Sequence, residues 1–73
     1  MNMLEAIEKS INEDKWFRPQ SWKGTRKAYV WDDINNTFKI VPSANGGRWA
    51  AFPKLDDIQG KWEVVSPAGV NGE

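Results

Sequence analysis

Apolar residues recur at helical spacing near the start of the chain. A helix is predicted over residues 3–13, with Leu4, Ile7 and Ile11 at positions i, i+3 and i+7 and with Met3 and Ala6 widening the apolar stripe. Asn2, followed three residues later by Glu5, is typical of a capping box at a helix start. The sequence therefore predicts an amphipathic helix whose apolar stripe packs on the core.

The rest of the chain alternates between apolar and polar positions over short runs, which is typical of β-strands. We predict extended segments at residues 16–18, 28–32, 37–41, 48–52 and 61–66. Turns are predicted at residues 33–36 and 43–47, and one helical turn at residues 54–60. Three apolar residues that alternate within these strands are expected in the core: Phe38, Trp62 and Val64.

This pattern predicts an α+β fold, with one N-terminal helix packed on a four- to five-stranded, mostly antiparallel sheet. The 73 residues suffice for one domain, which we place at residues 1–66. Residues 67–73 are rich in Pro and Gly and are predicted to form a flexible C-terminal tail.

The amino-acid composition excludes several kinds of functional site. The sequence has no Cys and no His, so it offers no disulfide, no Cys- or His-based metal site and no histidine general base. We therefore expect no enzyme activity, no catalytic residue, no metal and no cofactor. A core this small supplies about 3–5 kcal/mol, which makes a homo-oligomer the expected source of further stability.

The expected compartment is the cytoplasm. No apolar run approaches the roughly 18–20 residues that a membrane span needs. Residues 1–15 are acidic and amphipathic, which is not typical of a signal peptide. We expect no membrane partner.

Aromatic residues are in excess. The chain has five Trp, one Tyr and three Phe, and a core of this size cannot bury nine aromatic side chains. Net charge is zero, yet residues 15–31 carry five basic residues and no acid. This arrangement does not attract a long nucleic acid, but it can hold a few phosphates locally.

Trp22 is the first candidate for ligand binding. It lies in a polar stretch beside Lys23, with Arg18 and Arg26 four residues away on either side. An indole face can stack on a base, and neighbouring cations can pair with phosphates. The alternative is a Trp that closes the end of the core, beside cations that are only solvated.

Arg48 and Trp49 form the second candidate, directly after Gly46 and Gly47. Tandem glycines expose backbone N–H groups and let a ligand approach closely. The alternative is an ordinary hairpin with a core Trp. The predicted ligand-binding residues are Arg18, Trp22, Lys23, Arg26, Arg48 and Trp49.

Three stretches, taken in order, resemble a family of small phage proteins. The first is the opening helix followed by residues 18–24, Arg-Pro-Gln-Ser-Trp-Lys-Gly. The second is an Asn-Gly pair at residues 45–46, followed by Trp-Ala-Ala at residues 49–51. The third is Leu-Asp-Asp-Ile at residues 55–58, leading into Lys-Trp-Glu-Val-Val at residues 61–65.

The family is the Thoeris anti-defence sponge type, which also contains some anti-CRISPR proteins. The resemblance implies a phage protein that acts in the cytoplasm of an infected bacterium. It implies a homo-oligomer that sequesters a cyclic nucleotide or ADP-ribose-type immune signal without cleaving it.

Two other functions remain open from the residues. Exposed aromatic side chains also fit an inhibitor that binds a host defence enzyme, as an anti-CRISPR protein does. A small single-stranded nucleic-acid binder could use the sheet for stacking, although zero net charge does not favour it.

Overall fold

The computed structural model describes residues 1–41 and 53–73. Its first element is the helix α1 (Met3–Glu13), which confirms the predicted helix. Asn2 Oδ1 accepts a hydrogen bond from the Glu5 backbone N–H at 2.8 Å, and Glu5 Oε1 accepts one from the Asn2 backbone N–H at 3.2 Å. This capping box fixes the helix start, and Asp14 ends the helix in the left-handed conformation with a φ of 54°.

The buried face of α1 includes only part of the predicted stripe, namely Met3, Ala6 and Ile7. Ala6 and Ser10 are buried and Ile7 packs against the core, whereas Leu4 is 65% and Ile11 47% exposed. The small side chains of Ala6 and Ser10 allow a close approach to the sheet, and Ser10 Oγ donates to the Ile7 carbonyl at 2.8 Å. The prediction that Leu4 and Ile11 pack inward is therefore wrong.

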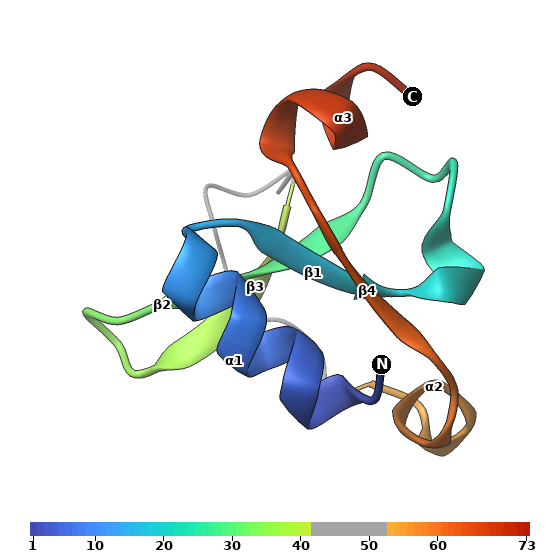
Figure 1. Cartoon of the computed structure of the whole chain (residues 1–73), viewed down its shortest axis with the longest axis horizontal. Helices are drawn as coiled ribbons and strands as arrows, with labels where there is room; N and C mark the ends of the chain where they lie inside the picture. The colour runs from blue at the N-terminus through green and yellow to red at the C-terminus, as the bar shows by residue number, and fades with distance from the viewer. Residues whose placement is uncertain (42–52) are drawn as a thin grey trace.

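Among residues 1–41 and 53–73, four strands form one antiparallel sheet in the order β3-β2-β1-β4. They are β1 (Trp16–Pro19), β2 (Ala28–Asp32), β3 (Thr37–Val41) and β4 (Trp62–Val65). α1 lies against β1, β2 and β4 (Figure 1). The predicted α+β class is confirmed, and the strand predicted at residues 48–52 lies outside the described residues.

One face of the sheet carries an aromatic core. Phe17 of β1 pairs with Tyr29 of β2 and with Val64 of β4. The ring centroid of Phe17 lies 5.6 Å from that of Tyr29 and 6.0 Å from that of Trp62. Trp62 is buried, as predicted, while Phe38 and Val64 are partly buried and pack against the same cluster.

The turn between β2 and β3 is held by Asp32. Its Oδ1 accepts hydrogen bonds from the backbone N–H groups of Ile34 and Asn35 at 3.1 and 3.3 Å. The side-chain amide of Asn35 donates to Oδ2 at 2.9 Å, and this bond is the largest cause of the lowered pKa of Asp32. Asn36 adopts a φ of 54°, so the predicted Asp/Asn turn is confirmed.

Two short helices flank β4. α2 (Leu55–Gln59) confirms the predicted helical turn. The flexible tail predicted for residues 67–73 needs correction, because this stretch forms α3 (Pro67–Asn71) with Val70 buried. Ser66 Oγ caps α3 by accepting from the Gly69 N–H at 3.1 Å. The proline at the first helical position further favours a helix here.

Within the described parts of the chain, no helix combines the length and apolar character needed to cross a bilayer.

Candidate functional site

Trp22 sits where the chain passes from β1 to β2. It ends the short 3-10 helix η1 (Gln20–Trp22), which follows Pro19 directly. The indole is half-buried and stacks on the ring of Tyr29, with 4.9 Å between centroids and 21° between planes. Tyr29 is itself buried, so it is a fixed support for the indole.

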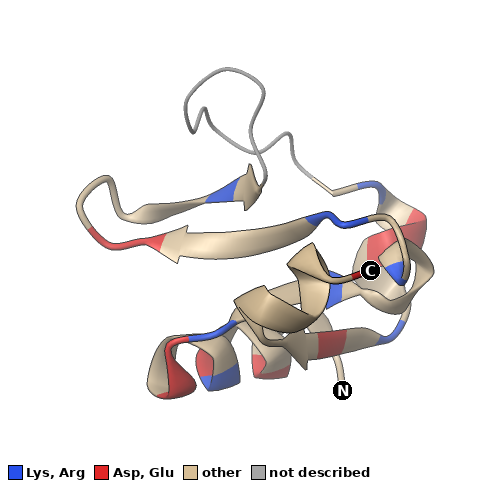
Figure 2. Ribbon diagram, turned by 90° about the horizontal axis from the view of Figure 1, so that it is seen from above, with Lys and Arg blue, Asp and Glu red and all other residues tan. Residues whose placement is uncertain are grey.

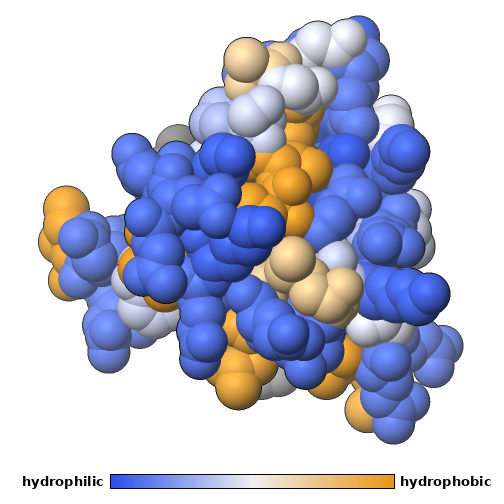
Figure 3. All heavy atoms as spheres, viewed as in Figure 1, coloured by the Kyte–Doolittle hydropathy of each residue, from blue (hydrophilic) through white to orange (hydrophobic). Residues whose placement is uncertain are grey.

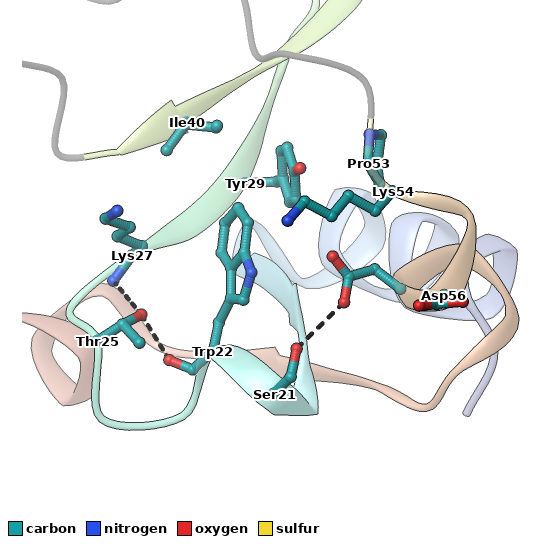
Figure 4. A pocket seen from close by; sticks show the side chains of 10 residues that line it. Ser21, Trp22, Thr25, Lys27, Tyr29, Ile40, Pro53, Lys54 and Asp56 are labelled. Carbon is teal, nitrogen blue, oxygen red and sulfur yellow. Dashed lines mark hydrogen bonds between the residues drawn. The ribbon is translucent and has the colours of Figure 1, made fainter.

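A hollow of about 550 Å³ opens beside this pair (Figure 4). In the described parts of the chain, its walls come from η1, the loop that follows it, β2, β3, the segment that leads into α2, and α2 itself. The described residues that line it are Ser21, Trp22, Thr25, Lys27, Tyr29, Ile40, Pro53, Lys54, Asp56 and Asp57. A volume of about 300–1,000 Å³ is typical of small-molecule sites.

Hydrogen bonds hold the walls of the hollow in place. Thr25 Oγ1 donates to the Trp22 carbonyl at 2.6 Å and accepts from the Lys27 N–H at 3.3 Å. Ser21 Oγ donates to Asp57 Oδ1 at 3.2 Å, which joins η1 to α2. The loop that carries Lys27 and the helix that carries Asp57 are therefore both fixed relative to the indole.

The hollow carries charges of both signs. Lys27 and Lys54 lie on different sides of Trp22 (Figure 4), and Asp56 and Asp57 line the hollow as well. Burial, and to a lesser extent the charge of Asp57, raise the pKa of the Tyr29 phenol above its ordinary value. The site can therefore stack a ring, pair cations with phosphates and accept hydrogen bonds on carboxylates.

The predicted ligand-binding residues are not all at the hollow. Trp22 lines it, while Lys23 is exposed at the end of η1 and is not among the lining residues. Arg26 is exposed, and its Nε donates to the backbone carbonyl of Glu73. Arg48 and Trp49 lie outside the described residues.

Arg18 is not among the described residues that line the hollow, and it is 3% exposed. Its guanidinium donates to Glu63 at 2.8 Å and to both carboxylate oxygens of Glu73 at 2.7 and 2.6 Å. The bonds to Glu73 are the largest cause of its raised pKa, although burial opposes the shift. In this structure Arg18 is paired within the chain rather than presented to a ligand in the hollow.

Of the described residues that line the hollow, the predicted ligand-binding set contained only Trp22; the residues that it missed include Tyr29, Lys27, Lys54, Asp56 and Asp57. The alternation of β2 places Tyr29 on the core side but does not reveal that Trp22 stacks on it. Lys54 and Asp57 reach the hollow because α2 folds back beside η1, an approach between segments more than 30 residues apart.

Figure 2 shows both acidic and basic residues on α1, acidic residues in the β2–β3 turn, and basic residues in the stretch that leads into β2. Among residues 1–41 and 53–73, no three acidic side chains are grouped in a way that could hold a metal ion.

Comparison with protein-family models, curated protein sequences and solved structures gives no match to this chain.

Proposed function

We propose that this protein binds a nucleotide-type small molecule in the hollow beside Trp22 and sequesters it without changing it chemically. The observation that carries the proposal is the half-buried indole, fixed from one side by Tyr29, in a hollow that also presents Lys27 and Lys54. A supported indole is a stacking surface for a base, and each stacked base contributes about 1–3 kcal/mol.

The charges of the hollow support a ligand with both phosphate and hydrogen-bond donor groups. The ammonium groups of Lys27 and Lys54 can pair with phosphates. The carboxylates of Asp56 and Asp57 can accept hydrogen bonds from exocyclic amino groups or ribose hydroxyls. A nucleotide carries all of these groups, whereas a plain hydrophobic molecule would leave four charged side chains unused.

On the resemblance to anti-defence sponges, we propose that this ligand is a cyclic nucleotide or an ADP-ribose-type immune signal. Such a phage protein acts by stoichiometry in the host cytoplasm, so it needs tight binding rather than turnover. Nanomolar affinity corresponds to about −12 kcal/mol. Stacking on Trp22 provides part of this, and a second subunit in a homo-oligomer would provide further contacts.

Calorimetry with cyclic dinucleotides, cyclic trinucleotides and cyclic ADP-ribose isomers tests the proposal. We expect one class to bind, and Trp22→Leu to weaken that binding by about 10-fold or more through loss of stacking. Trp31→Leu is the matched control, because Trp31 is a partly buried indole on β2 that does not line the hollow. Absence of binding across the whole panel would refute the proposal.

Recovery of the bound molecule separates sequestration from catalysis. The complex is denatured, and the released ligand is identified by mass. We expect the intact ligand after prolonged incubation, and a product of altered mass would show that the protein is an enzyme.

A second function is favoured by the exposed apolar side chains. Ile34 at the β2–β3 turn is 91% exposed, and Leu55 at the start of α2 is 65% exposed. Such residues fit an inhibitor that binds a host defence enzyme. A host protein captured in stoichiometric amount by both the parent and Trp22→Leu, but lost with Ile34→Lys, would favour this function.

A further inference from the structure

The side chain of Glu73 occupies a set of donors that converge from two parts of the chain. Arg18 donates from Nη1 to Oε1 at 2.7 Å and from Nη2 to Oε2 at 2.6 Å. The backbone N–H of Gly24 donates to Oε2 at 2.9 Å, and that of Arg26 donates to Oε1 at 3.1 Å. Each carboxylate oxygen therefore accepts one bond from the guanidinium and one from the backbone.

The guanidinium is fixed without the help of Glu73. Arg18 lies on β1 directly opposite Glu63 of β4, and its Nε donates to Glu63 Oε2 at 2.8 Å. This bond leaves the two Nη groups to form a bidentate edge, the geometry that matches a carboxylate or a phosphate. The buried position strengthens the attraction of this edge for an anion.

The two backbone donors belong to a loop with left-handed residues. Gly24 has a φ of 82° and Arg26 a φ of 60°. The loop bends so that the N–H groups of Gly24 and Arg26, two residues apart, both reach the carboxylate, and backbone N–H groups that converge in this way form an anion-binding concavity. Thr25 Oγ1 ties the loop to the Trp22 carbonyl at 2.6 Å, so the bend has an anchor besides Glu73.

We propose that Arg18 and the backbone N–H groups of Gly24 and Arg26 form a binding site for a carboxylate or phosphate group, which Glu73 fills from within the same chain. Four donors around two oxygens match such an oxyanion in both charge and shape. The low pKa of Glu73, about 2, agrees with a strongly electropositive site, and the bond from Arg18 is its largest cause.

The site and its occupant lie on different elements. Arg18 is part of β1, an interior strand of the sheet, whereas Glu73 follows the five-residue helix α3 by two positions. Release of residues 72–73 would vacate the site, while Val70 could keep its buried place. Glu73 would then act as an internal competitor, and an external oxyanion would bind in its stead.

The test uses the full chain with Glu73→Ala, titrated with sodium phosphate and with sodium acetate, against sodium chloride at matched ionic strength. The amide NMR signals of Gly24 and Arg26 report on the site directly. We expect saturable shifts of both signals with phosphate, acetate or both, and apparent affinity at least about 10-fold weaker in the parent protein, where Glu73 competes. A response to phosphate alone would identify a phosphate site, and one to acetate alone a carboxylate site.

Two controls make the result decisive. Arg18→Met combined with Glu73→Ala should abolish the saturable response, while Glu8→Ala, at an exposed glutamate on α1, should behave like the parent. Absence of saturation in Glu73→Ala, or an equal response in the double variant, would overturn the proposal. If Glu73→Ala does not fold, the isosteric Glu73→Gln is titrated in the same way, and the same two outcomes decide.

Discussion

Trp62 contributes to the core through both its ring and its N–H group. The ring lies in the cluster with Phe17 and Tyr29, and Nε1 donates to the Asp57 carbonyl at 2.7 Å. This bond joins β4 to α2, the helix that supplies the acidic side of the hollow. The Trp62 side chain therefore fixes the position of α2, a helix that lies outside the core.

We predict that Trp62→Phe destabilises the protein, because it leaves the Asp57 carbonyl without this donor and a smaller ring in the cluster. The expected loss in the free energy of unfolding is about 1–3 kcal/mol. Urea denaturation measures it. Trp31→Phe is the control and should cost less than Trp62→Phe, because Trp31 is not fully buried. Equal losses in the two variants would contradict the role assigned to the Nε1 bond.

Elements with strong local signals could be predicted from the sequence. α1 begins at its capping box and covers residues 3–13 as expected, because its determinants lie within a few residues of one another. Hydrophobicity predicts only part of the side of α1 that faces the sheet: Met3, Ala6 and Ile7 of the predicted stripe lie at the core, whereas Leu4 and Ile11 do not. Ser10 is buried because it is small, which matters only once a sheet lies against it.

The sequence contains a local signal for the start of α3, but the Pro- and Gly-rich composition of this stretch concealed it. Ser66 followed by Pro67 is typical of an N-cap and first helical residue, yet the neighbouring glycines suggested a frayed end. What places α3 is long-range: Val70 is buried, and Glu73 bonds to Arg18 across 55 residues.

The candidate site, like the helices, could be predicted only where its determinants are local in sequence. Trp22 could be predicted from its local setting, since it is an aromatic residue in a polar turn. The intrachain pairing of Arg18 could not, because a basic residue in a sequence does not reveal which acid folds against it. The carboxylates that hold Arg18 lie 45 and 55 residues away.

The link between α3 and the loop at residues 24–26 should depend on pH. The pKa of Glu73 falls from its ordinary value of 4.5 to about 2 in the folded protein, with the bond from Arg18 as the largest cause. A lowered folded-state pKa contributes stability above the unfolded-state value and loses it as the pH falls toward the folded-state value. We therefore expect the parent to be more stable than Glu73→Gln above about pH 5, and the difference to vanish between about pH 4.5 and pH 2.

Urea denaturation of the two proteins over this pH range measures the difference. Other carboxylates titrate in both proteins and largely cancel in the comparison. Glu8→Gln serves as the control, because Glu8 is exposed on α1 and its replacement should give no such pH dependence. A difference between the parent and Glu73→Gln that stays constant down to pH 2 would contradict the ionic link.

At the scale of the whole molecule, apolar side chains remain exposed after the core is complete. On the face shown in Figure 3, apolar atoms form several groups divided by hydrophilic side chains. Leu4 and Ile11 lie two helical turns apart on α1, and neither is buried by the sheet. A 73-residue domain has little core from which to draw stability, so burial of these residues in a second copy would be favourable.

We predict a homo-oligomer that α1 helps to form. Sedimentation equilibrium should show a mass above the 8.3 kDa of one chain. The thermal midpoint should rise with protein concentration, since association stabilises the folded state by mass action. Replacement of both Leu4 and Ile11 by Glu should shift the mass toward that of a monomer, because charged side chains would then face the contact.

Leu55→Glu is the matched control, since Leu55 is as exposed as Leu4 but lies on α2. We expect it to leave the mass unchanged. A monomer for the parent at the highest soluble concentration would rule out the oligomer. An oligomer that survives both substitutions in α1 but dissociates with Leu55→Glu would move the contact to α2, beside the hollow, where a second subunit could close over a ligand stacked on Trp22.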